Sequence, residues 1–410
     1  MAGPATTDVR AARLRRLAGG VVRTKRTRSD LAYYGGTPGF AEDIRVGTPN
    51  VPAKDRYLEL VGEAIDRRWL SNLGPLVRRF EALAAERTLR AHNTATNNAT
   101  TALQVAVKAC GVTGEVIMPS FTFVASAHAM DWIGLTPVFA DVDPETGTLD
   151  PRSVAKAVSP RTGGILGVHI WGNLCDTAGL DDVAREAGVP LVFDSAQAFG
   201  CLPLRPAPAG AAEVFSFHAT KILNCFEGGL VATDSAEVHA RVRSMHNFGF
   251  DETMDVVGPG TNAKMNESSA AMGIASVEHL DDMLKVYRAL YTRYRTGLAD
   301  VPGVSLMAAP QGQTHNHQYV VVRVDPEAAG LDRDRLMAVL DAENVRTKKY
   351  FSPGCHTMPP YRRETVHTPV DLSVTETLTE RVLALPTGLS VTPDDVDRIC
   401  DVIAAAVRYA

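Results

Sequence analysis

Short apolar runs alternate with helical patterns between residues 90 and 235. The runs, rich in β-branched or aromatic residues, lie at 116–118, 138–140, 165–170, 191–193, 214–217 and 230–232. They are apolar on both faces, which is typical of strands buried between two layers of helices. Residues 100–110 place their apolar side chains on one stripe, as an amphipathic helix does. The alternation predicts an α/β domain with a mostly parallel sheet.

Helical patterns flank this region. Residues 55–69 predict one helix, and the turn at 71–75 predicts the start of another. Pro75 suits a first helical position because the N–H that it lacks would have no partner there. Residues 267–298 predict one long helical segment, which we expect to be a spacer between two lobes.

The C-terminal part predicts a small α+β domain. Strand-like runs at 319–324 and 345–350 alternate with helical patterns at 333–341 and from Pro393 onwards. This mixture differs from the α/β rhythm of the preceding region. We therefore expect a second fold unit here.

Length and composition agree with two units. A chain of 410 residues with 45% hydrophobic residues can bury one large core and a second, smaller one. We place the large domain at 45–285 and the small domain at 286–410. A basic, partly flexible extension at 1–44 would precede them.

Charge is unevenly distributed along the chain. The whole chain has 22% charged residues and a formal net charge of −5, which argues against a disordered chain and against a protein that coats nucleic acid. Residues 1–28, however, contain seven Arg and one Lys against Asp8, a local charge of +7. We interpret this segment as a frayed, solvated extension. A transit-like leader or a phosphate-seeking arm is the alternative.

The apolar runs and the cysteines indicate where in the cell the protein is expected. No stretch approaches the ~18 apolar residues that a membrane span requires, so we expect a soluble protein without a membrane partner. The six cysteines form no Cys-x-x-Cys pair and mostly stand in apolar runs, which predicts reduced core residues and a cytoplasmic protein. Cys355 and His356 are adjacent residues of types that can bind a metal, but no further ligands follow at a suitable spacing. We assign them to core or loop packing and expect no metal site.

Two polar residues stand where predicted strands end. Asp194 follows the run 190–193, so its carboxylate should lie at the sheet edge where open α/β sheets bind ligands. There it could bind a metal ion, a ribose or a protonated ring nitrogen. Lys221 lies in a loop between two further strands and could reach the same cleft. An isolated lysine is ordinarily a solvated surface residue, but a lysine kept neutral by its surroundings condenses with aldehydes.

The same edge offers groups that suit an anion. Residues 98–100 precede the predicted helix at 100–110, whose first N–H groups and dipole would face the cleft. Ser216 adds a hydroxyl five residues before Lys221. Taken alone, residues 98–100 are an ordinary helix cap. Together with Lys221 and Asp194 they describe sites for a phosphate, an amine-reactive carbon and a ring nitrogen.

Five ordered motifs make this interpretation specific. They are Asn-Ala-Thr-Thr-Ala-Leu at 98–103, Pro-Ser-Phe-Thr-Phe-Val-Ala-Ser at 119–126, Asp-Ser-Ala-Gln at 194–197, Ser-Phe-His-Ala-Thr-Lys at 216–221 and Phe-Glu-Gly-Gly at 226–229. The chain from Leu31 to its C-terminus resembles the nucleotide-sugar aminotransferases of the DegT/DnrJ type, which are pyridoxal 5'-phosphate (PLP) enzymes of fold type I. The resemblance implies a large domain with a mostly parallel seven-stranded sheet between helices and a small C-terminal α+β domain.

The resemblance also implies roles around the cofactor ring. Lys221 would form the Schiff base with PLP and then move a proton between cofactor and sugar carbons. Asp194 would pair with the pyridinium nitrogen and keep it protonated. Gln197 would donate a hydrogen bond to the ring's 3-oxygen, and Phe123 would stack on the ring face.

Other matching positions would hold the cofactor phosphate. The backbone N–H groups of Ala99 and Thr100 and the hydroxyl of Ser216 would do so within one subunit. In this family the neighbouring subunit also reaches the phosphate, and the matching residue is Asn266, which implies a homodimer with shared active sites. A cap for the following helix is the alternative for Asn266.

Further segments resemble family members that aminate carbon 4 of TDP-4-keto-6-deoxy-D-glucose. They lie at 246–251, 260–265, 316–320 and 350–356. We therefore predict conversion to TDP-4-amino-4,6-dideoxy-D-glucose with L-glutamate as donor, for a deoxyaminosugar of an antibiotic or other natural product. Gln197 departs from those members, which have histidine there. Because glutamine is also found in 3-aminotransferases, a TDP-3-keto-deoxysugar is the alternative substrate.

Contacts to the sugar nucleotide are harder to locate from sequence. The candidates, each of which could equally be a packing residue, are Asn316, His317, Tyr319 and Lys349. Two rival functions remain. A PLP-dependent sugar dehydratase would have histidine in place of Lys221, and a non-catalytic sensor or scaffold would not need Lys221, Asp194 and Gln197 together.

Overall fold

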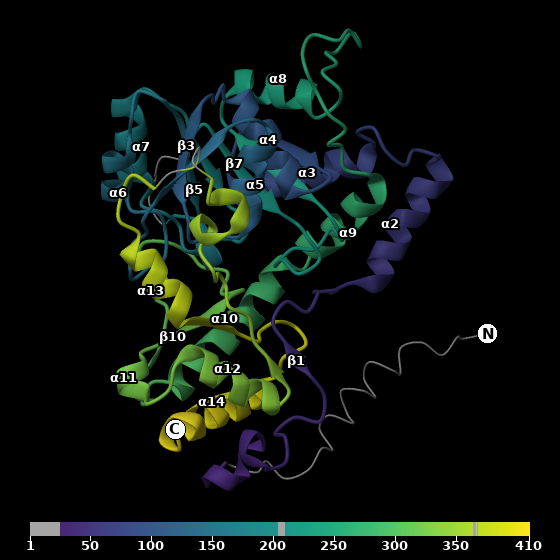
Figure 1. Cartoon of the computed structure of the whole chain (residues 1–410). Coiled ribbons are helices and arrows are strands. Elements are labelled where there is room, and N and C mark those ends of the chain that lie inside the picture. The colour runs from purple at the N-terminus through teal and green to yellow at the C-terminus, as the bar shows by residue number, and fades with distance from the viewer. Residues whose placement is uncertain (1–24, 204–209, 364–365, 367) are drawn as a thin grey trace, which may run out of the picture.

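A seven-stranded sheet forms the centre of the larger lobe in the computed structural model, which describes residues 25–203, 210–363, 366 and 368–410 (Figure 1). The strand order is β2-β8-β7-β6-β5-β3-β4. β8 runs antiparallel to both of its neighbours, and the other adjacent pairs are parallel. The predicted mostly parallel sheet of seven strands is therefore confirmed.

The strands follow the predicted runs closely, with one addition. Their bounds are β2 (His92–Thr96), β3 (Glu115–Pro119), β4 (Thr136–Ala140), β5 (Thr162–Val168), β6 (Leu191–Asp194), β7 (Ala212–Ser216) and β8 (Gly229–Thr233). The pattern did not predict β2, because its sequence His-Asn-Thr-Ala-Thr has no apolar run. Thr94 and Thr96 are nevertheless fully buried at this end of the sheet.

Helices cover both faces of the sheet. Their bounds are α2 (Lys54–Arg67), α3 (Pro75–Thr88), α4 (Ala99–Ala109), α5 (Val124–Trp132), α6 (Pro151–Ala157), α7 (Thr177–Ala187), α8 (Ala236–Met245) and α9 (Glu267–Val277). Val231 of β8 packs in a cluster with α4, α5 and α8. Its neighbours Leu230 and Ala232 pack on the other face with α2, α3 and α9. This alternation explains why the strand is apolar at every position.

The long helical segment predicted at 267–298 is instead two helices. α9 ends at Val277, and α10 (Leu280–Gly297) begins after a break at Glu278 and His279. Nearly all of α9 is buried against α2 and α3, whereas α10 buries one stripe and runs down to the small lobe (Figure 1). The two helices meet different surroundings, and an apolar pattern alone does not locate the break between them.

The smaller lobe is the predicted α+β unit. Its elements are β9 (Val304–Leu306), β10 (Val320–Val324), α11 (Pro326–Ala329), α12 (Arg333–Ala342), α13 (Ser373–Arg381), β12 (Val382–Leu385) and α14 (Pro393–Arg408). β10 is the central strand of an antiparallel sheet with β9 and β12. The run predicted at 345–350 is a strand only over β11 (Val345–Arg346), which pairs with β1 (Ile44–Arg45).

The described part of the N-terminal extension packs on the small lobe. Leu31 and Phe40 belong to the core of that lobe. The buried carboxylate of Glu343 pairs with Lys25 at 2.8 Å and accepts the backbone N–H groups of Ala32 and Gly39. Residues 1–24, which carry most of the predicted basic tail, lie outside the described residues.

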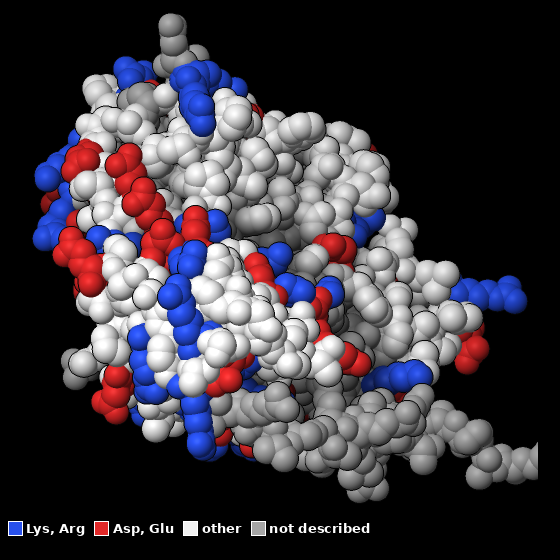
Figure 2. All heavy atoms as spheres, turned by 60° about the horizontal axis from the view of Figure 1, so that its bottom comes forward, with Lys and Arg blue, Asp and Glu red and all other residues white. Residues whose placement is uncertain are grey.

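The surface of the small lobe has mixed charge. Lys and Arg lie among Asp and Glu on the face shown in Figure 2, and Arg293 pairs with Asp397 and Lys349 with Asp334. Such exposed pairs contribute little stability but balance the local charge. All six cysteines are unpaired and five are buried, as predicted. No helix among the described residues is long and apolar enough to cross a membrane.

A buried carboxylate holds the start of α3. Glu267 accepts the backbone N–H groups of Leu76 and Val77 at 2.9 and 3.0 Å. Because two buried donors would lose a charged acceptor, Glu267→Ala should lower the free energy of unfolding by about 2–4 kcal/mol. Urea denaturation measures this loss. The control is Glu59→Ala, which removes an exposed carboxylate of α2 and should cost under about 1 kcal/mol; equal losses would contradict the assignment.

Candidate active site

Polar groups from four segments meet at the carboxyl edge of the large sheet. Asp194 is the last residue of β6 and Ser216 the last residue of β7. Lys221 lies in the loop from β7 to β8, and α4 begins just after β2. Asp194 and Lys221 are close enough for their charges to interact. The edge therefore gathers the residues that the strand pattern singled out.

Asp194 is a buried carboxylate with two donors. The hydroxyl of Ser126 on α5 donates to Oδ2 at 2.7 Å, and the N–H of Ala196 donates to Oδ1 at 3.1 Å. Burial raises the pKa of Asp194, and these bonds and the nearby Lys221 oppose that rise. The carboxylate is held in one orientation and would gain from a cationic partner.

Lys221 has an amine that is easily neutral. Burial lowers its pKa to about 8, while the carboxylate of Asp194 and the hydroxyl of Tyr350 act in the opposite direction. The residue as a whole is half-buried. A lysine of this kind can attack an aldehyde near neutral pH, whereas an ordinary solvated lysine is almost wholly charged there.

The lowered pKa predicts how the apoprotein takes up PLP. Only the neutral amine attacks, so the rate should rise with pH and level off above about 8. With the ordinary pKa of 10.5 the rise would continue far into the alkaline range. Stopped-flow absorbance against pH measures the midpoint, with Lys221→Ala as the control that gives no signal. A midpoint at the ordinary lysine value would refute burial as the cause.

The start of α4 forms a cradle for an anion. The Asn98 side chain accepts the N–H and hydroxyl of Thr101, which leaves the N–H groups of Ala99 and Thr100 without an acceptor in the helix. The chain of Asn98 passes so close to Gly229 that a Cβ there would lie 2.6 Å from a backbone carbon. Ser216 is the register partner of Gly229. Gly229 thus lets the start of α4 lie close to β8, and a phosphate group fits the donors at that helix start.

Two more predicted residues border the site. Phe123 caps the start of α5, is 57% exposed and has its ring centroid 5.9 Å from that of Phe351. Gln197 is buried, and its Oε1 accepts the N–H of Trp171 at 2.5 Å. Sequence reasoning missed Trp171, although it directly follows the run 165–170 and so obeys the same strand-end rule as Asp194.

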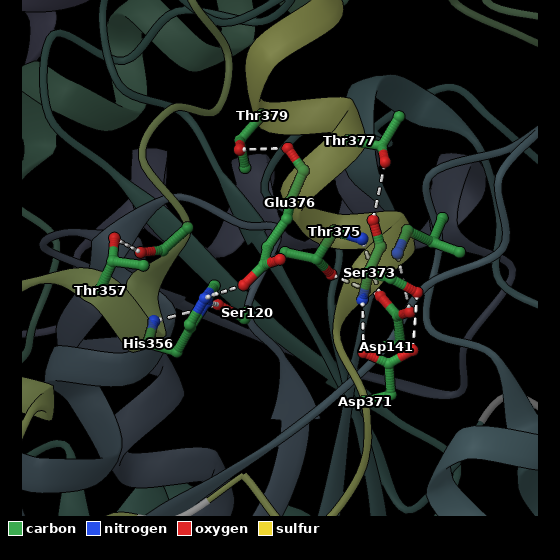
Figure 3. Close-up of polar contacts among 12 residues, drawn as sticks. Ser120, Asp141, His356, Thr357, Asp371, Ser373, Thr375, Glu376, Thr377 and Thr379 are labelled. Atoms are coloured by element: carbon green, nitrogen blue, oxygen red, sulfur yellow. Dashed lines mark hydrogen bonds and ion pairs between the residues drawn. The ribbon is translucent and has the colours of Figure 1, made fainter.

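Hydrogen bonds join the segment around His356 to the loop that carries Phe123. Ser120 accepts the N–H of His356 at 3.0 Å, and its hydroxyl lies 2.6 Å from Nδ1 of the same ring (Figure 3). Nε2 of His356 lies 3.7 Å from Glu376 of α13. Asp141, beyond β4, accepts both the N–H and the hydroxyl of Thr375 (Figure 3). His356 thus takes part in packing between lobes, and the described residues hold no cluster of three or more metal-ligating side chains.

The four residues considered for the sugar nucleotide lie in different surroundings. Asn316 is fully buried, and its amide donates to the carbonyl oxygens of Gln197 and Phe199. His317 stacks on Tyr291 with ring centroids 4.3 Å apart. These contacts account for the packing of both residues.

The other two candidates, Tyr319 and Lys349, have different partners. The hydroxyl of Tyr319 is 3.4 Å from Nζ of Lys221, inside the site. Lys349 pairs with Asp334 at 2.8 Å on the small lobe.

Asn266, the residue predicted to reach a second subunit, is exposed and accepts the N–H of Ser269 as the cap of α9. Both interpretations of Asn266 are compatible with this placement.

Known proteins match the chain along most of its length. Residues 53–404 match the DegT/DnrJ/EryC1/StrS aminotransferase family. A dTDP-4-amino-4,6-dideoxy-D-glucose transaminase of Shigella dysenteriae is 32% identical over 365 residues, which are 88% of this chain and 98% of the relative. A GDP-perosamine synthase of Caulobacter vibrioides is 32% identical over 363 residues, 87% of this chain and 96% of the relative. The crystal structure of DesI in the presence of its TDP-sugar product has 49% identity and a TM-score of 0.88, and the match covers 93% of this chain and 97% of that one.

Proposed function

Because the chain belongs to the DegT/DnrJ/EryC1/StrS aminotransferase family and is a PLP-dependent sugar aminotransferase, we propose that it aminates carbon 4 of TDP-4-keto-6-deoxy-D-glucose. L-Glutamate would be the donor and TDP-4-amino-4,6-dideoxy-D-glucose the product, for use in deoxyaminosugar biosynthesis. The observation that carries the reaction type is the pair of Lys221 and Asp194 at the sheet edge. The 49% identity to DesI, whose product is a TDP-sugar, supports the substrate class.

The residues of the site fit PLP. Bound PLP would supply an aldehyde that takes up the donor's amino group and a ring that accepts electrons from bonds at the amine-bearing carbon. Lys221 would hold the cofactor covalently and, once released, accept or return a proton at Nζ. Asp194, held by Ser126 and Ala196, would keep a proton on the ring nitrogen.

Other residues would orient the cofactor. The N–H groups of Ala99 and Thr100 and the hydroxyl of Ser216 would bind its phosphate at the start of α4. Phe123 would cover the ring face and exclude water from it. Gln197, whose Oε1 is already occupied by Trp171, has its Nε2 available as a donor to the 3-oxygen.

A direct test is incubation of the holoprotein and L-glutamate with separate keto sugars. We expect 2-oxoglutarate and an aminosugar from TDP-4-keto-6-deoxy-D-glucose, measured by mass spectrometry. Product from a TDP-3-keto-deoxysugar alone would favour the 3-aminotransferase alternative, to which Gln197 gives some support. The GDP-linked 4-keto sugar tests the nucleotide, since a GDP-perosamine synthase is among the relatives.

We also propose a homodimer in which each site uses Asn266 of the other subunit. Exposed apolar side chains support an interface: Leu58 and Ile65 on α2, and Met254 and Val256 in the loop before α9. Asn266 is itself exposed, which leaves it accessible to a second copy.

Shared sites predict complementation between two variants. Lys221→Ala and Asn266→Ala should each be impaired, and a mixture that exchanges subunits should regain activity, because one site of each mixed dimer has both residues intact. Steady-state assays before and after mixing measure the gain, and Lys221→Ala mixed with itself is the control. If Asn266 serves its own subunit, mixing will restore nothing.

A further inference from the structure

A chain of polar contacts ends at the amine of Lys221. It begins at Trp171, whose backbone N–H donates to Oε1 of Gln197 at 2.5 Å. An amide oxygen accepts hydrogen bonds and an amide nitrogen only donates them. The contact with a backbone donor therefore identifies the oxygen of Gln197 and turns its NH2 group the other way.

The next contact joins Gln197 to Tyr319. The hydrogen bond from Gln197 lowers the pKa of the buried Tyr319, against the rise that burial causes. Since Oε1 of Gln197 already accepts the N–H of Trp171, the NH2 group is the donor and the hydroxyl oxygen of Tyr319 the acceptor. The proton of Tyr319 is then free to point away from Gln197. Nζ of Lys221 lies 3.4 Å from the hydroxyl, to which the amine can donate, and when neutral the amine also offers a lone pair to the hydroxyl proton.

The first member of the chain is rigidly held. Trp171 has φ 58° and ψ 6°, a left-handed conformation that is costly for a bulky residue and persists where surrounding contacts impose it. Its indole N–H donates to the carbonyl oxygen of Tyr350 at 3.2 Å. The carbonyl oxygen of Gln197 in turn accepts the amide of Asn316. The orientation of Gln197 is thus imposed from both lobes.

We propose that Tyr319 is a positioning residue for Lys221: oriented by Gln197, its hydroxyl donates to the neutral amine and aims it at the reacting carbon. The inference rests on the proposed role of Lys221 as the amine that binds PLP. It replaces a sugar contact as the main task of Tyr319. No net proton is lost in this contact, since the hydroxyl keeps its proton and the amine supplies only its lone pair.

A role of Tyr319 at Lys221 and a role in sugar binding would have different effects on the two half-reactions. Lys221 would serve both the half-reaction with L-glutamate and the half-reaction with the keto sugar. Tyr319→Phe should therefore slow both single-turnover rates by a similar factor, about 10-fold to 100-fold, as expected for a misplaced reacting group. The KM for the sugar should stay unchanged. A residue that only contacts the sugar would leave the L-glutamate half-reaction untouched.

The experiment follows the visible spectrum of the holoprotein in a stopped-flow instrument. L-Glutamate alone and then TDP-4-keto-6-deoxy-D-glucose are added to wild type and Tyr319→Phe. Tyr294→Phe is the matched control, because it removes a buried hydroxyl that donates to Pro386 in the small lobe and should leave both rates unchanged. Borohydride trapping and peptide mapping establish that PLP is bound to Lys221 in each protein.

Gln197→Asn tests the chain itself, since it keeps the amide but withdraws it from Tyr319. In combination with Tyr319→Phe the rate losses should be less than multiplicative, because both changes remove the same contact. The pH midpoint of PLP uptake by the apoproteins provides a readout besides activity, and it should shift in Tyr319→Phe and in Gln197→Asn but not in Tyr294→Phe.

The outcomes separate the two proposals. Absence of trapped PLP at Lys221 in wild type would overturn the proposed function. Normal trapping with a slowed sugar half-reaction alone, or with multiplicative losses in the double variant, would overturn only the role of Tyr319. Equal slowing of both half-reactions with an unchanged sugar KM is the result that we expect.

Discussion

Lys221→Ala is expected to lower kcat for transamination by about 10³-fold to 10⁴-fold, because the variant loses both the amine that holds the cofactor and the group that moves the proton. The fold should survive, since Lys221 is half-buried and lies in the loop between β7 and β8. Steady-state assays with L-glutamate and the 4-keto sugar measure the loss.

Two controls make the result specific. Lys108→Ala removes an exposed lysine from α4 and should leave kcat unchanged. A small primary amine such as methylamine should partly restore the activity of Lys221→Ala, because it can supply a proton acceptor in the space of the missing side chain. Full activity of Lys221→Ala without added amine would disprove the central role of this residue.

Asp194→Asn should produce the second large effect. It keeps the size of the side chain but removes the charge that would pair with the ring nitrogen in a buried site. Breaking a buried pair costs about 3–5 kcal/mol, so kcat should fall by about 10²-fold to 10⁴-fold. Single-turnover rates with L-glutamate measure the effect on the step that depends on the ring.

Ser126→Ala provides a graded comparison. It removes one donor to Asp194 and leaves the charge, so the loss should be smaller, about tenfold to a hundredfold. An Asp194→Asn protein as fast as wild type would mean that the carboxylate does not face the ring nitrogen. A loss in Ser126→Ala larger than in Asp194→Asn would point to a different task for that hydroxyl.

The large sheet and the lysine site were accessible from the sequence for a common reason. Parallel strands buried on both faces appear as continuous apolar runs, and their carboxyl ends share one edge. A polar residue that directly follows such a run, as Asp194 does, must lie at that edge. Lys221 follows from the same rule, because its loop joins two of the strands. Local sequence and strand direction were therefore sufficient.

Elements without a strong pattern were not accessible in this way. β2 is polar in sequence and is buried because β8 pairs with it and helices, α3 and α8 among them, pack on it. The break between α9 and α10 depends on what each helix packs against, and an apolar pattern continues across it. In both cases the deciding contacts join residues that are distant in the chain.

The amino-acid sequence thus predicted the α/β architecture, the sheet edge proposed as the active site, and the lysine, carboxylate and helix start that the structure places there. Contacts between residues distant in the chain established the rest: that Trp171 donates to Gln197, that Tyr319 lies beside Lys221, and that His356 binds Ser120. The physical reason is the distance along the chain between the residues that determine each feature. Periodicity and strand ends are set by neighbouring residues, whereas a hydrogen bond between positions 98 residues apart depends on how two folded lobes meet.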